Sequence, residues 1–241
     1  MVAALGRAYN VLGDKNYLKL SDKLVELIYN KLVCEKDNKI LDDYSYTILG
    51  LIELYEGSYN FKYIKKAIEL NEIMINSFWD EKDYGFYLYS NKKIKEIREL
   101  DRPSGNAIAT YNLTKLAKLT GDSSLENYAI KQIEYISDKV KEEEVKYSFC
   151  YIASSFKISM GKKLICLVKG KKDIDKVKLA LRKKEDFELT TIVVTKENKK
   201  EFERIAKFLQ DYPIVNNKST YYLCENDGSK APVNDIKEIL V

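Results

Sequence analysis

A unit of two helices joined by a short turn recurs three times in the first part of the sequence. This repetition constrains the fold more than any other feature. Tyr9 and Tyr17 flank the turn of the first copy, and Tyr55 and Tyr63 repeat the same spacing in the second. A third copy aligns with them through its Gly-Asp turn at 121–122. Apolar residues recur at helical spacing on both sides of each turn, so the sequence predicts an array of antiparallel helical hairpins.

The three copies are unevenly spaced, because an extra segment at 80–103 separates the second from the third. Loops of variable length on one rim are typical of an α/α toroid and not of a regular solenoid. The first helix of each copy is the smaller and more apolar one, while the second carries more lysine and glutamate. We therefore expect the first helices to form an inner row and the second helices a wetter outer row. The apolar segment 144–159 is expected to be the last helix of the array.

From Gly161 onward, short apolar strands alternate with amphipathic helices. Strands are expected in 162–170, 190–195 and 221–224, and helices in 174–184, 196–210 and 235–240. This alternation predicts a small parallel or mixed α/β segment. The predicted fold class is thus mainly α: a partial α/α toroid of about three hairpins and one helix over 1–160, followed by a small α/β appendage over 161–241.

The sequence contains no histidine. This excludes a Ser-His-Asp or Cys-His relay within this chain, and any histidine metal cluster. Four cysteines (Cys34, Cys150, Cys166 and Cys224) lie far apart without a CxxC pair, which fits a reducing compartment. Glycine-rich nucleotide motifs are absent. We expect neither a metal nor a cofactor.

The net charge is only +4, and the lysines alternate with acidic residues. This pattern indicates a solvated face and not a nucleic-acid footprint. The start, MVAALGRAYNVL, lacks the basic residues and the long apolar run of a signal peptide, and no stretch is apolar enough to span a bilayer. We expect a cytoplasmic protein without nucleic-acid or membrane partners.

Asp42 and Asp43 are the candidate catalytic residues, at the predicted start of an inner helix. Acidic residues here also favour the helix dipole and the unpaired N–H groups, so a purely structural role is the alternative. On a helix, adjacent side chains diverge by about 100°. The two carboxylates therefore do not form a catalytic pair by themselves.

Arg102, Pro103, Ser104, Gly105 and Asn106 form the strongest local signal. The proline favours an extended entry and the serine a helix cap, while the glycine allows close approach to the backbone. A helix start alone does not require Gly-Asn, because both residues have poor helix propensity. Substrate binding by Arg102, Ser104, Gly105 and Asn106 is therefore one interpretation, with a plain helix start as the other.

Two aromatic residues, Trp79 and Tyr84, bracket a turn that precedes a run of further aromatics. They are candidates for stacking on a sugar ring. The alternative is that they anchor the extra segment to the rim of the toroid.

Four motifs, LDDYSY, FWDEKDYGFYLY, RPSGNAIATYNLTKLAKLTGD and YYLCENDGSKAPV, occur in an order that resembles a known family. They are similar to the C-terminal part of thioredoxin-domain-containing proteins with an N-acylglucosamine 2-epimerase-like, six-hairpin glycosidase-like α/α toroid. Such proteins start with a thioredoxin-like domain and the first half of the barrel. The resemblance therefore implies that this chain is a fragment or the product of a shortened gene. Its matching polar positions are Asp42, Asp43, Arg102, Ser104, Gly105 and Asn106.

Two departures limit what the resemblance implies. Relatives carry a second cysteine shortly after the position of Cys224, and sugar epimerases of the related fold use histidines for proton transfer. Neither group is present here. We expect a carbohydrate-related scaffold that is not catalytic alone, with a sugar or sugar derivative as ligand. Alternatives are a carbohydrate-active hydrolase or isomerase using the rim carboxylates, and a helical protein-binding module. We also expect a homo-oligomer, or pairing with a missing N-terminal half.

Overall fold

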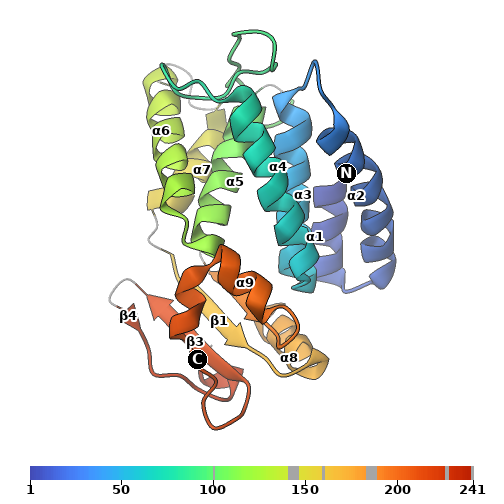
Figure 1. Ribbon diagram of the computed structural model, residues 1–241, viewed down its shortest axis with the longest axis vertical. Helices are drawn as coiled ribbons and strands as arrows, with labels where there is room; N and C mark the ends of the chain where they lie inside the picture. Colours follow the sequence, from blue (N-terminus) through green and yellow to red (C-terminus); the bar gives the residue numbers. More distant parts are fainter. Residues whose placement is uncertain (100, 141–146, 159–160, 183–188, 226–227, 240–241) are drawn as a thin grey trace. The chain divides into compact units, whose positions relative to one another are not determined.

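The computed structural model describes residues 1–99, 101–140, 147–158, 161–182, 189–225 and 228–239 (Figure 1). The chain divides into two compact units. The first contains Met1–Thr114 and Ser123–Ile158, and the second contains Lys115–Asp122 and Ser159–Val241.

The predicted hairpins make up the first unit, apart from Lys115–Asp122, which is assigned to the second. The helices are α1 (Val2–Leu12), α2 (Lys15–Cys34), α3 (Leu41–Ser58), α4 (Phe61–Phe78), α5 (Gly105–Thr120), α6 (Ser123–Lys139) and α7 (Ser148–Ile158). Figure 1 shows them side by side, with successive helices running in opposite directions within each hairpin. The mainly α fold class, with helical hairpins followed by a small α/β segment, is confirmed. Of the residues predicted for the last helix, 144–146 and 159 lie outside the described residues.

The three hairpin turns share one backbone conformation. The chain leaves the first helix through a left-handed residue: Gly13 at φ 76°, Tyr59 at φ 54° and Gly121 at φ 70°. Asp14 and Asn60 then cap the second helix of their hairpins, each accepting a hydrogen bond from the backbone N–H two residues on. The glycine turns read from the sequence therefore reverse the chain in the first and third copies, whereas Tyr59 and Asn60 do so in the second, where Gly57 lies within α3.

Burial separates inner from outer helices. Helix α3 buries residues around most of its circumference, and α5 is buried along almost its whole length. Helix α2 buries only a stripe, represented by Ser21, Val25 and Leu32, and exposes the rest. The predicted inner and outer rows are therefore present around α3 and α5.

Glycines bring α1 and α3 unusually close together. A Cβ added to Gly50 would lie 2.8 Å from Cγ1 of Val2, and one added to Gly6 would lie 3.1 Å from Cβ of Glu53. Gly57 likewise meets the ring of Tyr9. Because there is no room for side chains at these points, the two backbones approach each other directly.

The second unit is a small α/β sheet. Its elements are β1 (Lys163–Leu167), α8 (Lys171–Arg182), β2 (Thr190–Val194), α9 (Lys199–Ile205), β3 (Thr220–Glu225) and β4 (Gly228–Ser229), in the strand order β2-β1-β3-β4. Strand β1 pairs parallel with β2 and antiparallel with β3, with Ile165 opposite Ile192 on one side and Tyr222 on the other. The sheet is therefore mixed. Nearly every residue of β1 and β2 is buried, as expected for strands covered on both faces.

Two predicted helices of this unit are shorter than expected. The helix predicted for 196–210 is α9 followed by a 3₁₀ turn at Lys207–Asp211, and the predicted closing helix is a 3₁₀ turn at Ile236–Glu238. Across the described part of the chain, no helix combines the length and the apolar character needed to cross a membrane.

The close packing of α1 on α3 predicts that a Gly→Ala change at Gly50 destabilises the protein. A Gly→Ala change inside a helix normally stabilises it by about 1 kcal/mol. Gly50→Ala should instead lower the free energy of unfolding by about 1 kcal/mol, because overpacking costs more than the helix gains. Urea unfolding followed by the fluorescence of Trp79, the one tryptophan of the sequence, measures this change in the first unit.

Gly170→Ala is the matched control, because a Cβ at Gly170 meets nothing within 4 Å. Its unfolding midpoint should stay unchanged. A more stable Gly50→Ala protein would contradict the close approach of α1 and α3.

Candidate functional site

The carboxylate of Asp42 joins the starts of two inner helices. Asp42 lies in the first turn of α3, and its carboxylate lies against the backbone of Gly105, the first residue of α5, whose N–H group lowers the pKa of the carboxyl. Its Oδ2 atom also lies 3.0 Å from Nη2 of Arg102. A Cβ added to Gly105 would overlap Oδ1 of Asp42. The close approach to the backbone that the glycine suggested is therefore made by a side chain of the protein itself.

The residues before α5 are fixed from both ends. The Oγ of Ser104 accepts a hydrogen bond from the N–H of Ala107 at 3.2 Å, which is the helix cap expected from the sequence. The hydroxyl of Tyr46, one turn after Asp42 on α3, donates to the carbonyl oxygen of Pro103 at 2.7 Å. Asp42, Tyr46, Arg102, Ser104 and Gly105 together are called the rim site below.

The electrostatics of the rim site centre on Asp42. Burial raises its pKa above the usual range. Arg102 and the N–H of Gly105 oppose this effect, while the neighbouring Asp43 adds to it. The side chain of Asp42 is 20% exposed and that of Arg102 is 67% exposed, so both are within reach of a ligand. Asp43 is exposed to solvent. The two candidate carboxylates thus have different environments, and it is Asp42 that contacts Arg102 and α5.

Asn106 has a structural position. Its side chain is fully buried, and its amide group donates to the carbonyl oxygens of Phe86 and Glu96. Its oxygen accepts from the N–H of Phe86 and from the side chain of Gln132. These four bonds use the donors and acceptors of the amide, so Asn106 holds the segment 80–103 against α5 and has no capacity left for a ligand.

Trp79 and Tyr84 lie in an aromatic cluster. Their rings stack at a centroid distance of 6.2 Å, and Trp79 also meets the rings of Phe86 and Tyr128 edge-on. Lys131 lies over the ring of Tyr84 at 4.8 Å. These contacts match the alternative role considered for the pair, which is to anchor the segment 80–103 to its neighbours.

Sequence reasoning missed a buried ion pair in the segment 80–103. Nζ of Lys95 lies 2.7 Å from Oδ2 of Asp80, and both side chains are close to 10% exposed. Burial alone would raise the pKa of Asp80. Hydrogen bonds from Lys95, from the hydroxyl of Tyr87 and from backbone N–H groups outweigh burial and hold the pKa far below its usual range. The hydrogen bond between the Tyr87 hydroxyl and Asp80 raises the pKa of Tyr87 to about 12. In the sequence, Lys95 belonged to a charge run that reads as a solvated face, so no signal set it apart.

Glu99 was also missed. Its carboxylate accepts hydrogen bonds from the backbone N–H groups of Phe149 and Cys150, at 2.9 and 3.0 Å, and so caps the start of α7 from a distant part of the chain. Burial and the adjacent Glu99 carboxylate raise the pKa of the Cys150 thiol far above its usual value, so the thiol stays protonated. A cap supplied from about fifty residues away in sequence leaves no local signature.

The rim site therefore offers a half-buried carboxyl, an accessible guanidinium and a phenol. A carboxylate accepts hydrogen bonds from hydroxyl groups, and a guanidinium donates them. Among the described residues, no three Cys, Asp or Glu side chains are grouped as metal ligands. The arrangement is suited to binding a polar, uncharged molecule by hydrogen bonds.

Comparison with known proteins places the chain among distant relatives. No protein-family model matches it. The chain is 22% identical over 207 residues to human spermatogenesis-associated protein 20, covering 83% of this chain and 26% of that protein, and 23% identical to the rat protein over the same length. It is similar to thioredoxin-domain-containing, epimerase-like proteins. The predicted resemblance is thereby confirmed.

The chain spans about a quarter of the length of these curated relatives. An uncharacterised protein of Caenorhabditis elegans is 26% identical over 139 residues, which is 48% of this chain and 19% of that protein. Among solved structures, cellobiose 2-epimerase from Bacillus thermoamylovorans aligns with 97% of this chain and 80% of its own, at 15% identity and a TM-score of 0.42. A likeness at that score carries no argument about the rim site.

The ion pair of Asp80 and Lys95 gives a pH-dependent prediction. Asp80→Asn should lower the free energy of unfolding at pH 7 by about 3 kcal/mol, because it leaves the Lys95 ammonium buried without its partner charge. The pKa of Asp80 is lowered in the folded state, so its contribution is present above the unfolded value of 3.8 and is lost as the pH falls below it. The stability difference between the two proteins should therefore shrink in acid.

Urea unfolding between pH 7 and pH 3 measures the difference. The exposed neighbour Glu81 supplies the control, since Glu81→Gln should change little at either pH. If the difference in free energy of unfolding between the Asp80→Asn and unaltered proteins stayed constant with pH, the pairing with Lys95 would not lower the pKa of Asp80.

Proposed function

We propose that the rim site binds an uncharged sugar, within a scaffold that is not catalytic by itself. The observation that carries the proposal is the placement of Asp42 between the N–H of Gly105 and the exposed guanidinium of Arg102. This placement supplies a fixed acceptor beside accessible donors, which is the combination that a pair of sugar hydroxyl groups requires. The similarity to epimerase-like relatives supports a carbohydrate as the ligand.

An uncharged ligand is favoured because the positive groups of this region are already paired. The N-terminus of α5 faces the carboxylate of Asp42, and that of α7 faces Glu99. Arg102 contacts Asp42 as well, while Asp43 and Asp101 stay exposed. A phosphate or carboxylate on the ligand would meet surplus negative charge from these acidic side chains.

The lack of catalysis by this chain alone follows from the spacing of its acidic groups. Hydrolysis or epimerisation of a sugar needs an acid and a base on either side of the reacting atoms. Asp42 faces α5, Asp43 is exposed to solvent, and Glu99 is engaged by the backbone of α7. Without a histidine in the sequence, the rim site holds one suitable carboxyl and no second group opposite it.

Saturation-transfer NMR with a panel of sugars tests the proposal. Glucose, N-acetylglucosamine and cellobiose represent uncharged sugars, while glucose 6-phosphate and glucuronate represent anionic ones. We expect signals from uncharged sugars, and a weakening of roughly tenfold in affinity for Asp42→Asn, because a hydrogen bond to a charged group is lost. Asp37→Asn, at an exposed position shortly before α3, is the control and should bind normally.

Binding that depends on Asp43 and not on Asp42 would overturn the assignment of the carboxylate. A preference for the anionic sugars, or no binding across the panel, would overturn the proposal itself.

Self-association, or pairing with another helical segment, stays a prediction. Two large apolar side chains of α2, Leu20 and Leu27, are 48% and 71% exposed. They lie two turns apart, away from Asp22 and Tyr29, which contact α4. Sedimentation at micromolar concentration tests the self-associating form, and a single species at the chain mass of 28.0 kDa would contradict it.

A further inference from the structure

Two residues of α3 hold two consecutive residues before α5. Asp42 contacts Arg102 at 3.0 Å, and Tyr46 donates to the carbonyl oxygen of Pro103 at 2.7 Å. Positions four apart lie on the same face of a helix, so Asp42 and Tyr46 face the same short stretch of chain. The two contacts thus form a clamp across the entry to α5.

The contact of Arg102 with Asp42 is weak by itself. An ion pair with an exposed arginine contributes about 0–1 kcal/mol, because water competes for both groups and the long side chain loses freedom. Arg102 is 67% exposed. Its guanidinium stays near Asp42 only if the backbone that carries it is held in place.

The backbone of this stretch is held by Pro103 and Tyr46. The proline ring restricts both its own φ and the conformation of the preceding residue, Arg102. The Tyr46 hydroxyl then fixes the orientation of the following peptide group through its carbonyl oxygen. Burial, followed by the nearby carboxylate of Asp42, raises the pKa of Tyr46, so the hydroxyl keeps its proton and remains a donor at neutral pH.

We propose that Tyr46 is the positioning residue of the rim site, which holds the Arg102–Pro103 stretch so that the guanidinium pairs with Asp42. Its hydroxyl acts on the carboxylate only through Arg102. The expected effect of Tyr46 on sugar affinity rests on the proposed sugar-binding function, whereas its expected effect on the pKa of Asp42 does not.

The titration of Asp42 separates this role from a merely structural one. Burial and Asp43 raise the pKa of Asp42, while Arg102 and the N–H of Gly105 lower it. The hydroxyl of Tyr46 donates to the carbonyl oxygen of Pro103 and not to Asp42, so its loss should reach Asp42 by releasing Arg102. Because Arg102 lowers the pKa of Asp42, Tyr46→Phe should shift the midpoint upward.

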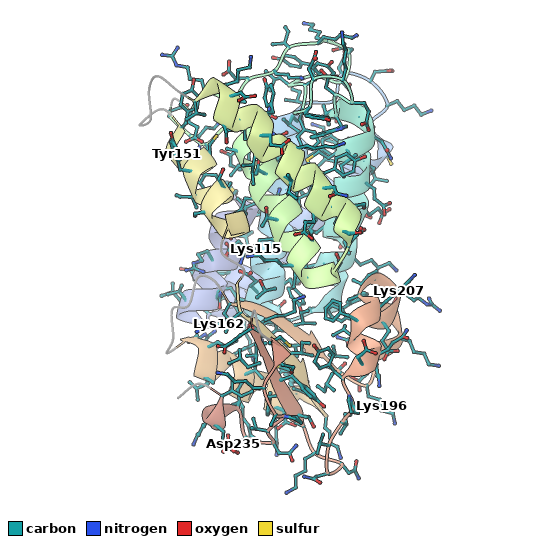
Figure 2. The ribbon with its side chains drawn as sticks, turned by 90° about the vertical axis from the view of Figure 1, so that its left-hand side faces the viewer. Lys115, Tyr151, Lys162, Lys196, Lys207 and Asp235 are labelled. Atoms are coloured by element: carbon teal, nitrogen blue, oxygen red, sulfur yellow. The ribbon has the colours of Figure 1, made fainter. Side chains whose placement is uncertain are left out.

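The measurement is a pH titration of the Asp42 carboxyl carbon by NMR in the full chain, with no sugar present. Arg102→Gln, a change at an exposed side chain, should shift the midpoint upward as well. Tyr46→Phe added to Arg102→Gln should then cause no further shift, which closes a double-mutant cycle. Tyr151→Phe is the control: Tyr151 lies on α7 with 48% exposure (Figure 2), and the midpoint of Asp42 should not respond to it.

An unchanged Asp42 midpoint in a folded Tyr46→Phe protein would overturn the proposal. So would an upward shift of the midpoint that Tyr46→Phe causes equally with Arg102 present and with Arg102 replaced by glutamine. If Tyr46→Phe were unfolded, as judged by a loss of dispersion in its NMR spectrum, Arg102→Gln would still test the proposal. An unaltered Asp42 midpoint in Arg102→Gln would show that Arg102 does not act on the pKa of Asp42, which would overturn it. Sugar affinity should fall in Tyr46→Phe together with the midpoint shift. A shift without any sugar binding would overturn the proposed function and leave the positioning role standing.

Discussion

The carboxylate of Asp42 lies against the first N–H group of α5, and the geometry of the rim depends on that contact. A helix start leaves several N–H groups without partners, and in α5 one of them faces a negative charge carried by α3. Only glycine at position 105 leaves room for it. Glu99 acts in the same way on α7, where it accepts from two backbone N–H groups. Carboxylates thereby hold the starts of α5 and α7 against parts of the chain that are distant in sequence.

Under the proposed function, these acidic side chains favour an uncharged ligand at the rim. Helix starts and an arginine in one place would ordinarily attract a phosphate or a carboxylate. Here Asp42 and Glu99, two acidic side chains of the protein itself, already lie at the starts of α5 and α7. Burial raises the pKa of Asp42, while Arg102 and the N–H of Gly105 act against this effect. A hydrogen bond to a partly buried carboxylate is electrostatically stronger than one to a fully solvated aspartate.

The segment 80–103 shows how polar groups stabilise an irregular stretch. Its described backbone forms isolated bridges and turns, and Asn106 and the ion pair of Asp80 and Lys95 satisfy further buried groups. Buried polar groups of this kind are costly unless every partner is present. The segment is therefore ordered by a few specific contacts, and its position in turn fixes Glu99 and Arg102 at the rim.

The sequence by itself determined the repeated hairpins, their turns and the change to α/β structure after Gly161. Those features depend on apolar periodicity and on turn residues such as Gly13 and Asp14, which act over a few neighbouring positions. It also located the helix starts at Asp42 and Ser104. The tertiary structure alone decided what those residues do. The partner of Asp42 at Gly105, the four bonds of Asn106 and the cap that Glu99 places on α7 join positions from about ten to sixty residues apart. No local pattern records such contacts, because they arise only when separate helices pack together.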